Sequence, residues 1–300
     1  MSKSSIAWNE FGTLKNALGL EKYMQREYEH VGYYHYTTLQ SIDNILGSKA
    51  FWLSSVQGFN DKKEIEFFGE NANKYFSLCF STGVNENLAL WYLYSGVEGK
   101  GGRIKLTKTG IQKLIENSRY CLAIKKKDSD ELIELFELTE KDYEYKFKDV
   151  IYFKDGEKRV NLKYNTMTNY NISKDEFEKY KDKNFGFYKY LIWYYEKETR
   201  LLVELKGKAE EHVKKHSLTD DEHYIVKMSF GDLTDVIKSL KIDLGPEFDD
   251  IEKIKEYKNI YNFLMNTSNV SKSEYSGQIK MNLKNKDCDN CEEKDRKNDK

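Results

Sequence analysis

The sequence has few of the residues that mark a secreted or a membrane protein. Its 300 residues include only four cysteines and one proline. Four cysteines in so long a chain exclude a disulfide-stapled scaffold. No apolar run is long enough to span a bilayer, and the first residues lack the apolar core of a signal peptide. We therefore expect a cytoplasmic protein that does not associate with a membrane.

An excess of charge of either sign is also missing. The 49 basic and 50 acidic residues leave a net charge of −1, so no overall field indicates a nucleic-acid partner. Apolar residues make up 39% of the chain, which is low, whereas aromatic residues reach 14%. We expect a core that is rich in tyrosine and phenylalanine.

The distribution of apolar residues divides the chain into three parts. Residues 1–30 have an irregular helical spacing and predict an N-terminal helical extension. Residues 31–279 predict a single domain, in which the charged and tyrosine-rich region 107–185 is interpreted as helices and loops inserted between core strands, with one strand near 150–153. Residues 280–300 contain almost nothing apolar and are expected to be a disordered charged tail.

Short apolar runs alternate with helical patterns along the domain. Strands are expected at 31–36, 50–54, 75–81, 103–106, 195–205 and 224–230, and helices at 39–46, 88–94, 108–118 and 250–265. The strands are short and their connections uneven, which is not typical of a doubly wound parallel sheet. The pattern predicts an α+β fold with a split or mixed β-sheet core and peripheral helices.

The segment Y-Y-E-K-E-T-R (194–200) places charges inside an otherwise apolar run. If it is a strand, Glu196, Glu198 and Arg200 share one face, because residues two apart point the same way. Two buried carboxylates are unfavourable unless Arg200 or a ligand compensates them. The residues alone leave two interpretations open: a structural ion pair at a sheet edge, or carboxylates held for chemistry.

Other polar residues offer weaker signals. His35 ends one expected strand and Ser81 ends another, and ligands often bind at such places. Cys79 has no activating base nearby in the sequence, so a thiol nucleophile is not expected. The five histidines show no metal spacing, and the pair Cys288 and Cys291 is half a zinc motif in a polar tail, so we expect no metal site.

Eight short motifs together resemble a known family. They are Y-H-Y-T-T (34–38), F-W-L-S (51–54), F-N-D-x-x-E (59–64), L-C-F-S (78–81), A-L-W-Y-L-Y (89–94), G-x-I (102–104), W-Y-Y-E-K-E-T-R (193–200) and L-G-P (244–246). Their order resembles domain of unknown function 2971, a bacterial and phage-borne family whose fold is similar to that of the ADP-ribosyltransferases. The resemblance extends over residues 31–276.

The resemblance implies a set of roles for an NAD site. His35 would bond a ribose hydroxyl of NAD, and Glu198 would be the catalytic glutamate of an E-x-E pattern. Glu196 would contact the acceptor, and Arg200 would hold both carboxylates ionised. Further cofactor-binding candidates, among them the residues that would line the nicotinamide pocket, are Tyr36, Thr37, Trp52 and Ser81. The chain departs from the family pattern, since it has neither a clean Arg-Ser-Glu nor a clean His-Tyr-Glu triad.

The function that the resemblance implies is an NAD-dependent ADP-ribosyltransferase that modifies a protein or nucleic acid, as a toxin or anti-phage defence effector. Three alternatives remain open. One is an NAD glycohydrolase. Another is a catalytically silent binding module for a nucleotide, nucleic acid or protein, with a basic rim formed by Lys105, Lys108, Lys113 and residues 125–127. The third is a toxin–antitoxin or defence partner that docks through the tail 280–300.

Overall fold

The computed structural model describes residues 30–276, except 84, 97–99, 127–131, 157–158, 164–168, 217, 249–250 and 268. The helix expected at the N-terminus, the charged tail over 280–300 and the pair Cys288 and Cys291 lie outside the described residues. Among the residues described, no helix is both long and apolar enough to cross a membrane.

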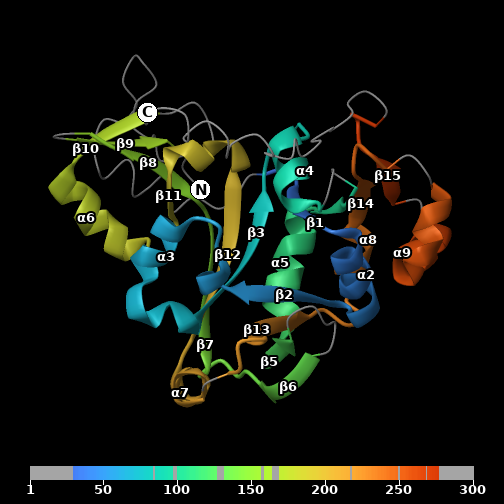
Figure 1. Cartoon of the computed structure of the whole chain (residues 1–300), viewed down its shortest axis with the longest axis horizontal. Coiled ribbons are helices and arrows are strands. Elements are labelled where there is room, and N and C mark those ends of the chain that lie inside the picture. Colours follow the sequence, from blue (N-terminus) through green and yellow to red (C-terminus); the bar gives the residue numbers. More distant parts are fainter. Residues whose placement is uncertain are drawn as a thin grey trace, which may run out of the picture.

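The fold is α+β, as the sequence predicts, and is built on a large mixed sheet (Figure 1). The main sheet contains β1 (Tyr33–Thr37), β2 (Ala50–Ser55), β3 (Tyr75–Ser81), β4 (Gly102–Leu106), β5 (Arg119–Lys126), β6 (Leu132–Glu137), β7 (Tyr143–Asp149), β12 (Glu198–Leu205), β13 (Glu222–Ser229), β14 (Lys241–Leu244) and β15 (Val270–Lys272). A smaller sheet contains β8 (Ile151–Asp155), β9 (Arg159–Lys163), β10 (Asn169–Ser173) and β11 (Tyr188–Tyr190).

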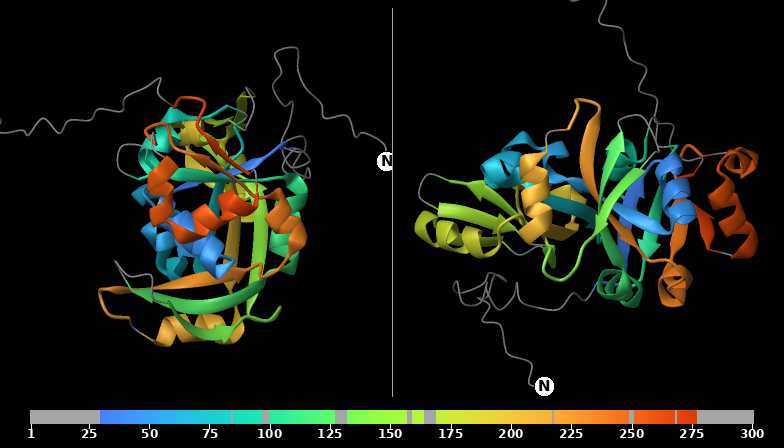
Figure 2. Two further views of the ribbon diagram at one scale, coloured as in Figure 1. Left: turned by 90° about the vertical axis from the view of Figure 1, so that its right-hand side faces the viewer. Right: turned by 90° about the horizontal axis from the view of Figure 1, so that it is seen from below.

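Helices surround both sheets. The α-helices are α2 (Leu39–Ser48), α3 (Lys62–Phe68), α4 (Leu88–Tyr94), α5 (Lys108–Asn117), α6 (Lys174–Lys183), α7 (Gly207–Lys215), α8 (Thr234–Ser239) and α9 (Lys258–Asn266). Short 3₁₀ helices are η1 (Val56–Gly58), η2 (Gly69–Lys74), η4 (Leu191–Glu196) and η5 (Ile251–Glu256). The small sheet with α6 lies at one end of the molecule, and α9 lies at the opposite end (Figure 2).

The main sheet forks at β3. Along one edge β3 pairs with β12 over its whole length. On the other edge its last residue, Ser81, pairs with Tyr34 of β1, whereas Ser77 and Phe76 pair with β2. Residues 78–80 therefore lie between two strands that diverge. Beyond β1 the order continues to β4, β14 and β15, and beyond β2 to β13, β5 and β6.

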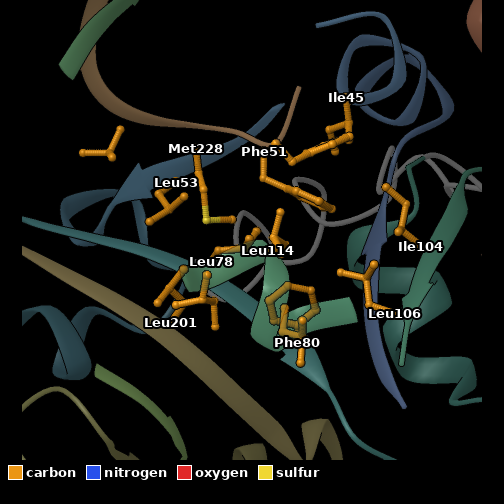
Figure 3. Close-up of a cluster of buried hydrophobic side chains, with 14 of the residues drawn as sticks. Ile45, Phe51, Leu53, Leu78, Phe80, Ile104, Leu106, Leu114, Leu201 and Met228 are labelled. Atoms are coloured by element: carbon orange, nitrogen blue, oxygen red, sulfur yellow. The ribbon is translucent and has the colours of Figure 1, made fainter. Parts of the chain in front are cut away.

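The main core fills the space beneath this fork. Apolar side chains from several strands meet there, including Phe51, Leu78, Phe80, Leu201 and Met228 (Figure 3). All five are at most 3% exposed. Along β3 and β12 these apolar residues alternate with residues that point to the opposite side of the sheet. One face of each strand therefore packs into the core.

Region 107–185 differs from its predicted structure. The expected helices there are limited to α5 and α6, and most of the region forms β5 to β10. In β7 (YEYKFKD) aromatic residues alternate with charged ones, so the strand has period two although half of its residues carry charge. Such charged, partly exposed strands do not form the apolar runs on which the prediction depended.

The late strand also begins later than predicted. The expected strand at 195–205 starts only at Glu198, and Glu196 is the last residue of η4. Lys197 lies between them with φ of 44°, a left-handed conformation that turns the chain. Its carbonyl accepts hydrogen bonds from the backbone N–H and the hydroxyl of Thr82, both at 3.0 Å, which fixes this turn beside the end of β3.

Candidate functional site

A cavity of about 330 Å³ opens where the sheet forks. It lies near the end of β3. In Figure 1, α4 and η4 are seen on the same side of the molecule as this end of the strand. Its walls are formed by residues of β1, η1, α3, β3, α4, β11, η4 and β12. The lining residues are Tyr34, His35, Tyr36, Gly58, Phe59, Asn60, Glu64, Cys79, Phe80, Ser81, Leu90, Tyr94, Lys189, Glu196, Glu198 and Arg200.

Most of the residues singled out from the sequence meet at this cavity. Those that line it are His35, Tyr36, Ser81, Glu196, Glu198 and Arg200. Two candidates do not line it. Thr37 pairs with Gly102 at the end of β1. Trp52 lies on β2, where the ammonium of Lys125 sits 4.8 Å from the centre of its ring.

Backbone pairing brings Glu198 to the end of β3. Glu198 lies opposite Ser81 in the antiparallel register of β12 and β3. Its backbone N–H donates to the hydroxyl of Tyr152 at 2.8 Å, so the small sheet also holds the start of β12. Glu198 is only 4% exposed.

Arg200 is 1% exposed, as is Glu64, and these are the two most enclosed charges of the site. Its Nε donates to Glu198 Oε1 at 2.7 Å, and its Nη1 donates to the carbonyl of Gly186 at 2.7 Å. The same Nη1 lies 2.5 Å from Glu64 Oε1. The guanidinium carbon lies 4.8 Å from the centre of the Phe59 ring, a cation–π distance.

Lys189 of β11 links the three carboxylates of the cavity. Its ammonium lies 2.6 Å from Glu196 Oε2, 3.3 Å from Glu198 Oε2 and 3.7 Å from Glu64 Oε2. Tyr94 of α4 donates its hydroxyl hydrogen to Glu196 Oε1 at 2.6 Å. Glu196 thus reaches the cluster from η4, although it does not share a strand with Glu198.

Burial acts differently on the three carboxyl groups. Burial raises the pKa of Glu64 and of Glu196 above the ordinary value, although Lys189 is close to both and Arg200 is close to Glu64. Burial alone would also raise the pKa of Glu198, but the charges of Arg200 and Lys189 outweigh it and hold that pKa well below the usual range. Glu198 is therefore the group of the three that stays ionised.

His35 fills the gap between the diverging strands. Its Nδ1 is 2.9 Å from the carbonyl oxygen of Cys79, one of the residues of β3 between β1 and β2. A carbonyl only accepts, so Nδ1 carries the hydrogen. Burial lowers the pKa of His35, and the neutral ring then presents Nε2 as an acceptor.

Tyr36 is fixed by a second buried network beside the cavity. Its hydroxyl accepts from Nη1 of Arg103 at 3.0 Å, and its ring packs edge-on against Trp91 with centroids 4.9 Å apart. Trp91 in turn donates to Glu86 at 3.0 Å. These contacts give the aromatic wall of the cavity a defined orientation.

Glu64 and Lys189 are site residues that the sequence did not reveal. Glu64 stands in the F-N-D-x-x-E motif, in which Asp61 caps α3, but the sequence pattern assigned it no role in the site. Lys189 is one of many lysines in the chain, and nothing in its sequence neighbourhood distinguishes it. Its role follows from the pairing of β11 with β8, which no local pattern predicts.

Comparisons with known proteins found no relative of the chain. No family model, no curated protein and no solved structure matches it. Within the described residues, no group of three or more His, Cys, Asp or Glu side chains is arranged to hold a metal ion.

Proposed function

We propose that this protein is an NAD-dependent ADP-ribosyltransferase that modifies a macromolecule. The observation that carries the proposal is the meeting of His35 and the ionised Glu198 at one aromatic-lined cavity. The forked sheet supports an ADP-ribosyltransferase-like fold, because both groups come from strands that pair with β3 at its end. They are the two residues to which the sequence resemblance assigns the ribose contact and the catalytic carboxylate.

The cavity suits the nicotinamide-ribose part of NAD. Its volume of about 330 Å³ lies at the lower end of the range for small-molecule sites. Aromatic walls such as those of Tyr36, Phe80 and Tyr94 provide flat apolar surfaces, and His35, Ser81 and Glu198 provide polar groups. Mostly apolar walls with a few convergent polar groups are typical of sites that bind such a ligand.

In the proposed reaction, the bond between nicotinamide and C1′ of the ribose breaks and nicotinamide leaves with the electron pair. Positive charge develops on the sugar, as in glycoside cleavage. The carboxylate of Glu198 stabilises that charge, and His35 bonds a ribose hydroxyl through Nε2. The acceptor then bonds to C1′ and gives up a proton, which Glu196 receives.

The test is to incubate the purified protein with NAD labelled in the adenine, alone and in a cell lysate, and to follow nicotinamide release and transfer of label. Glu198→Gln should reduce nicotinamide release by about 10²-fold or more. The fold should persist in this variant, because two carboxylates then face the two cations Lys189 and Arg200.

Glu204→Gln is the matched control. Glu204 lies on the same strand, β12, but bonds Tyr75 and the amino groups of Lys74 and Lys206 away from the cavity. This variant should release nicotinamide at the wild-type rate. Undiminished activity of Glu198→Gln would refute the assignment of the catalytic glutamate.

The same experiment separates the alternatives. Label on protein or nucleic acid supports a transferase and identifies the class of acceptor. Free ADP-ribose without transfer identifies a glycohydrolase that uses the same site. No nicotinamide release in either setting, with no rise in Tm on adding NAD, refutes the proposal and favours a binding module.

A further inference from the structure

The buried charges of the cavity do not balance. Three carboxylates, those of Glu64, Glu196 and Glu198, face only two cations, Lys189 and Arg200. Each of these five residues is at most 7% exposed, so bulk water does little to screen the excess. An uncompensated buried carboxylate is costly, and such a group takes up a proton or pairs with a cation.

No other described group near the cluster supplies the missing positive charge. His35 on β1 is neutral, and its Nδ1 donates to the carbonyl oxygen of Cys79. From β7, Lys148 lies opposite Arg200, but its ammonium lies against the Phe187 ring at 5.9 Å. Lys197, between Glu196 and Glu198 in the chain, lines a different cavity, and the ammonium of Lys63 lies 4.9 Å from the centre of the Tyr190 ring. Four further titratable neighbours are neutral at pH 7, since burial raises the pKa of each; they are Cys79 on β3, Tyr94 on α4, Tyr152 on β8 and Tyr195 on η4.

We infer that the cavity selects a cationic ring, the pyridinium of oxidised NAD, and that its binding expels one proton from the pair Glu64 and Glu196. In the empty cavity that proton neutralises the excess carboxylate, and the bound cation replaces it. The aromatic walls favour the same ligand, because a cation is attracted to the faces of tyrosine and phenylalanine rings. The inference rests on the proposed function for the identity of the ligand.

Proton expulsion has a consequence for the reaction. Glu198 remains ionised throughout, held by Arg200 and Lys189. Loss of the shared proton leaves Glu196 ionised as well when the ligand is in place. The residue proposed to take the proton of the acceptor is thereby made ready by ligand binding itself.

A matched pair of small probes tests the charge selection. 1-Methylnicotinamide is a cation, whereas nicotinamide is a neutral molecule of nearly the same shape. Calorimetric titration of the full chain at pH 7 should show about tenfold or more preference for the cation. Repeating the titration in phosphate and in Tris, which differ in ionisation enthalpy, should show release of about one proton per cation bound and none for nicotinamide.

Glu196→Gln removes the excess charge and should abolish both the preference and the proton release. Its glutamine side chain can still accept from Lys189, so the cluster is retained, and a thermal melt verifies folding. Glu204→Gln, outside the cavity, should behave as the wild type. Should Glu196→Gln fail to fold, the wild-type affinity for 1-methylnicotinamide must still rise with pH.

Equal binding of the two probes, absence of binding by either, or cation binding without proton release overturns the inference. These outcomes are distinct from failure of the proposed function. A protein that cleaves NAD but binds both probes equally contradicts only the charge selection. A protein that never releases nicotinamide but prefers the cation with proton release contradicts only the transferase proposal.

Discussion

At Arg200 the chain encloses a guanidinium almost completely and uses it for three polar contacts besides the one with the Phe59 ring. It pairs with Glu198 and Glu64 and donates to the carbonyl of Gly186. Removing one partner of a buried ion pair leaves uncompensated charge, which costs more than the pair itself contributes. Arg200 therefore balances the charge of the carboxylates in the site. It also links β12 to the segment before β11, which we call its brace role.

The first stability prediction follows from these contacts. Arg200→Met should lower the free energy of unfolding by about 3–5 kcal/mol. Arg200→Lys should cost less, because it keeps the charge but cannot make all the contacts of the guanidinium. Urea unfolding measures the free energy of unfolding of both Arg200 variants. Arg119→Met, which removes an exposed side chain 3.9 Å from Glu137, is the control and should change stability by less than about 1 kcal/mol. An equal effect at both positions would contradict the brace role.

The contributions of Glu198 and Glu196 to the free energy of unfolding should change with pH in opposite directions. Burial opposes ionisation of Glu198, but Arg200 and Lys189 depress its folded pKa below the unfolded value near 4.5. Its contribution is thus present above that pH and is lost as the pH falls. Burial raises the folded pKa of Glu196, so its contribution is greatest at low pH and is lost as the pH rises.

The measurement is the free energy of unfolding of the wild type, Glu198→Gln and Glu196→Gln between pH 3.5 and 7. The stabilising effect of Glu198 relative to glutamine should grow with pH, while that of Glu196 should shrink. Parallel curves for the two variants would show that the two carboxyl groups share one environment, contrary to the geometry.

Residue types and spacing predicted part of this site, and contacts between distant elements supplied the rest. Alternation in Y-Y-E-K-E-T-R correctly brought Glu198 and Arg200 to one face of a strand. It misplaced Glu196, because the left-handed turn at Lys197 depends on Thr82, a residue 115 positions away. Glu64 and Lys189 could not be identified from their neighbours, since only their ion pairs with Arg200 and Glu198 of β12 make them site residues.

At the scale of elements, the helix α9 depends on a carboxylate from a distant part of the chain. Asp43 of α2 is 9% exposed and lies 216 positions before Asn259. Its Oδ1 accepts from the backbone N–H groups of Asn259 and Ile260 at 2.7 and 2.9 Å, in the first turn of α9. The acid satisfies otherwise unpaired donors and complements the helix dipole.

Asp43→Ala should therefore destabilise the protein by about 1–3 kcal/mol, with hydrogen exchange in α9 rising most. Asp43→Asn keeps one oxygen acceptor and should cost less. Asp220→Ala removes an exposed carboxylate in a turn and should have little effect. Unchanged exchange in α9 for Asp43→Ala would mean that packing alone holds the helix.

Elements with strong local patterns were predicted closely. The strand β3 and the helix α4 have the expected bounds, because a continuous apolar run and the Asn87 cap specify them locally. In the small sheet, the strand expected near 150–153 is confirmed as β8, but the other strands were missed, since a segment such as β9 (RVNLK) has the length and polarity of a loop. Its two apolar residues become core residues only when β8 and α6 cover them.

At the scale of the molecule, the small sheet acts as a second support for the cavity. Phe153 of β8 is 2% exposed and lies at its centre. Its ring centroid lies 4.5 Å from that of Tyr190 and 6.5 Å from that of Tyr188, the residues on either side of Lys189. It also lies 5.9 Å from the ring of Phe67 on α3, the helix that carries Glu64. The side chain of Phe153 thus packs against both β11 and α3, the elements that carry Lys189 and Glu64.

Phe153→Ala should disturb the site without unfolding the main sheet. Loss of the ring costs about 3–5 kcal/mol, concentrated in the small sheet, and lets Lys189 and Glu64 move away from Glu198. Nicotinamide release should fall strongly and hydrogen exchange should rise in β8, β11 and α3, while β3 and β13 remain protected. Leu240→Ala, equally buried in the main core but absent from the cavity wall, is the control and should lower Tm with little change in nicotinamide release well below Tm. Equal losses of nicotinamide release in the two variants would mean that general stability, rather than the position in which the small sheet holds Lys189, limits the proposed reaction.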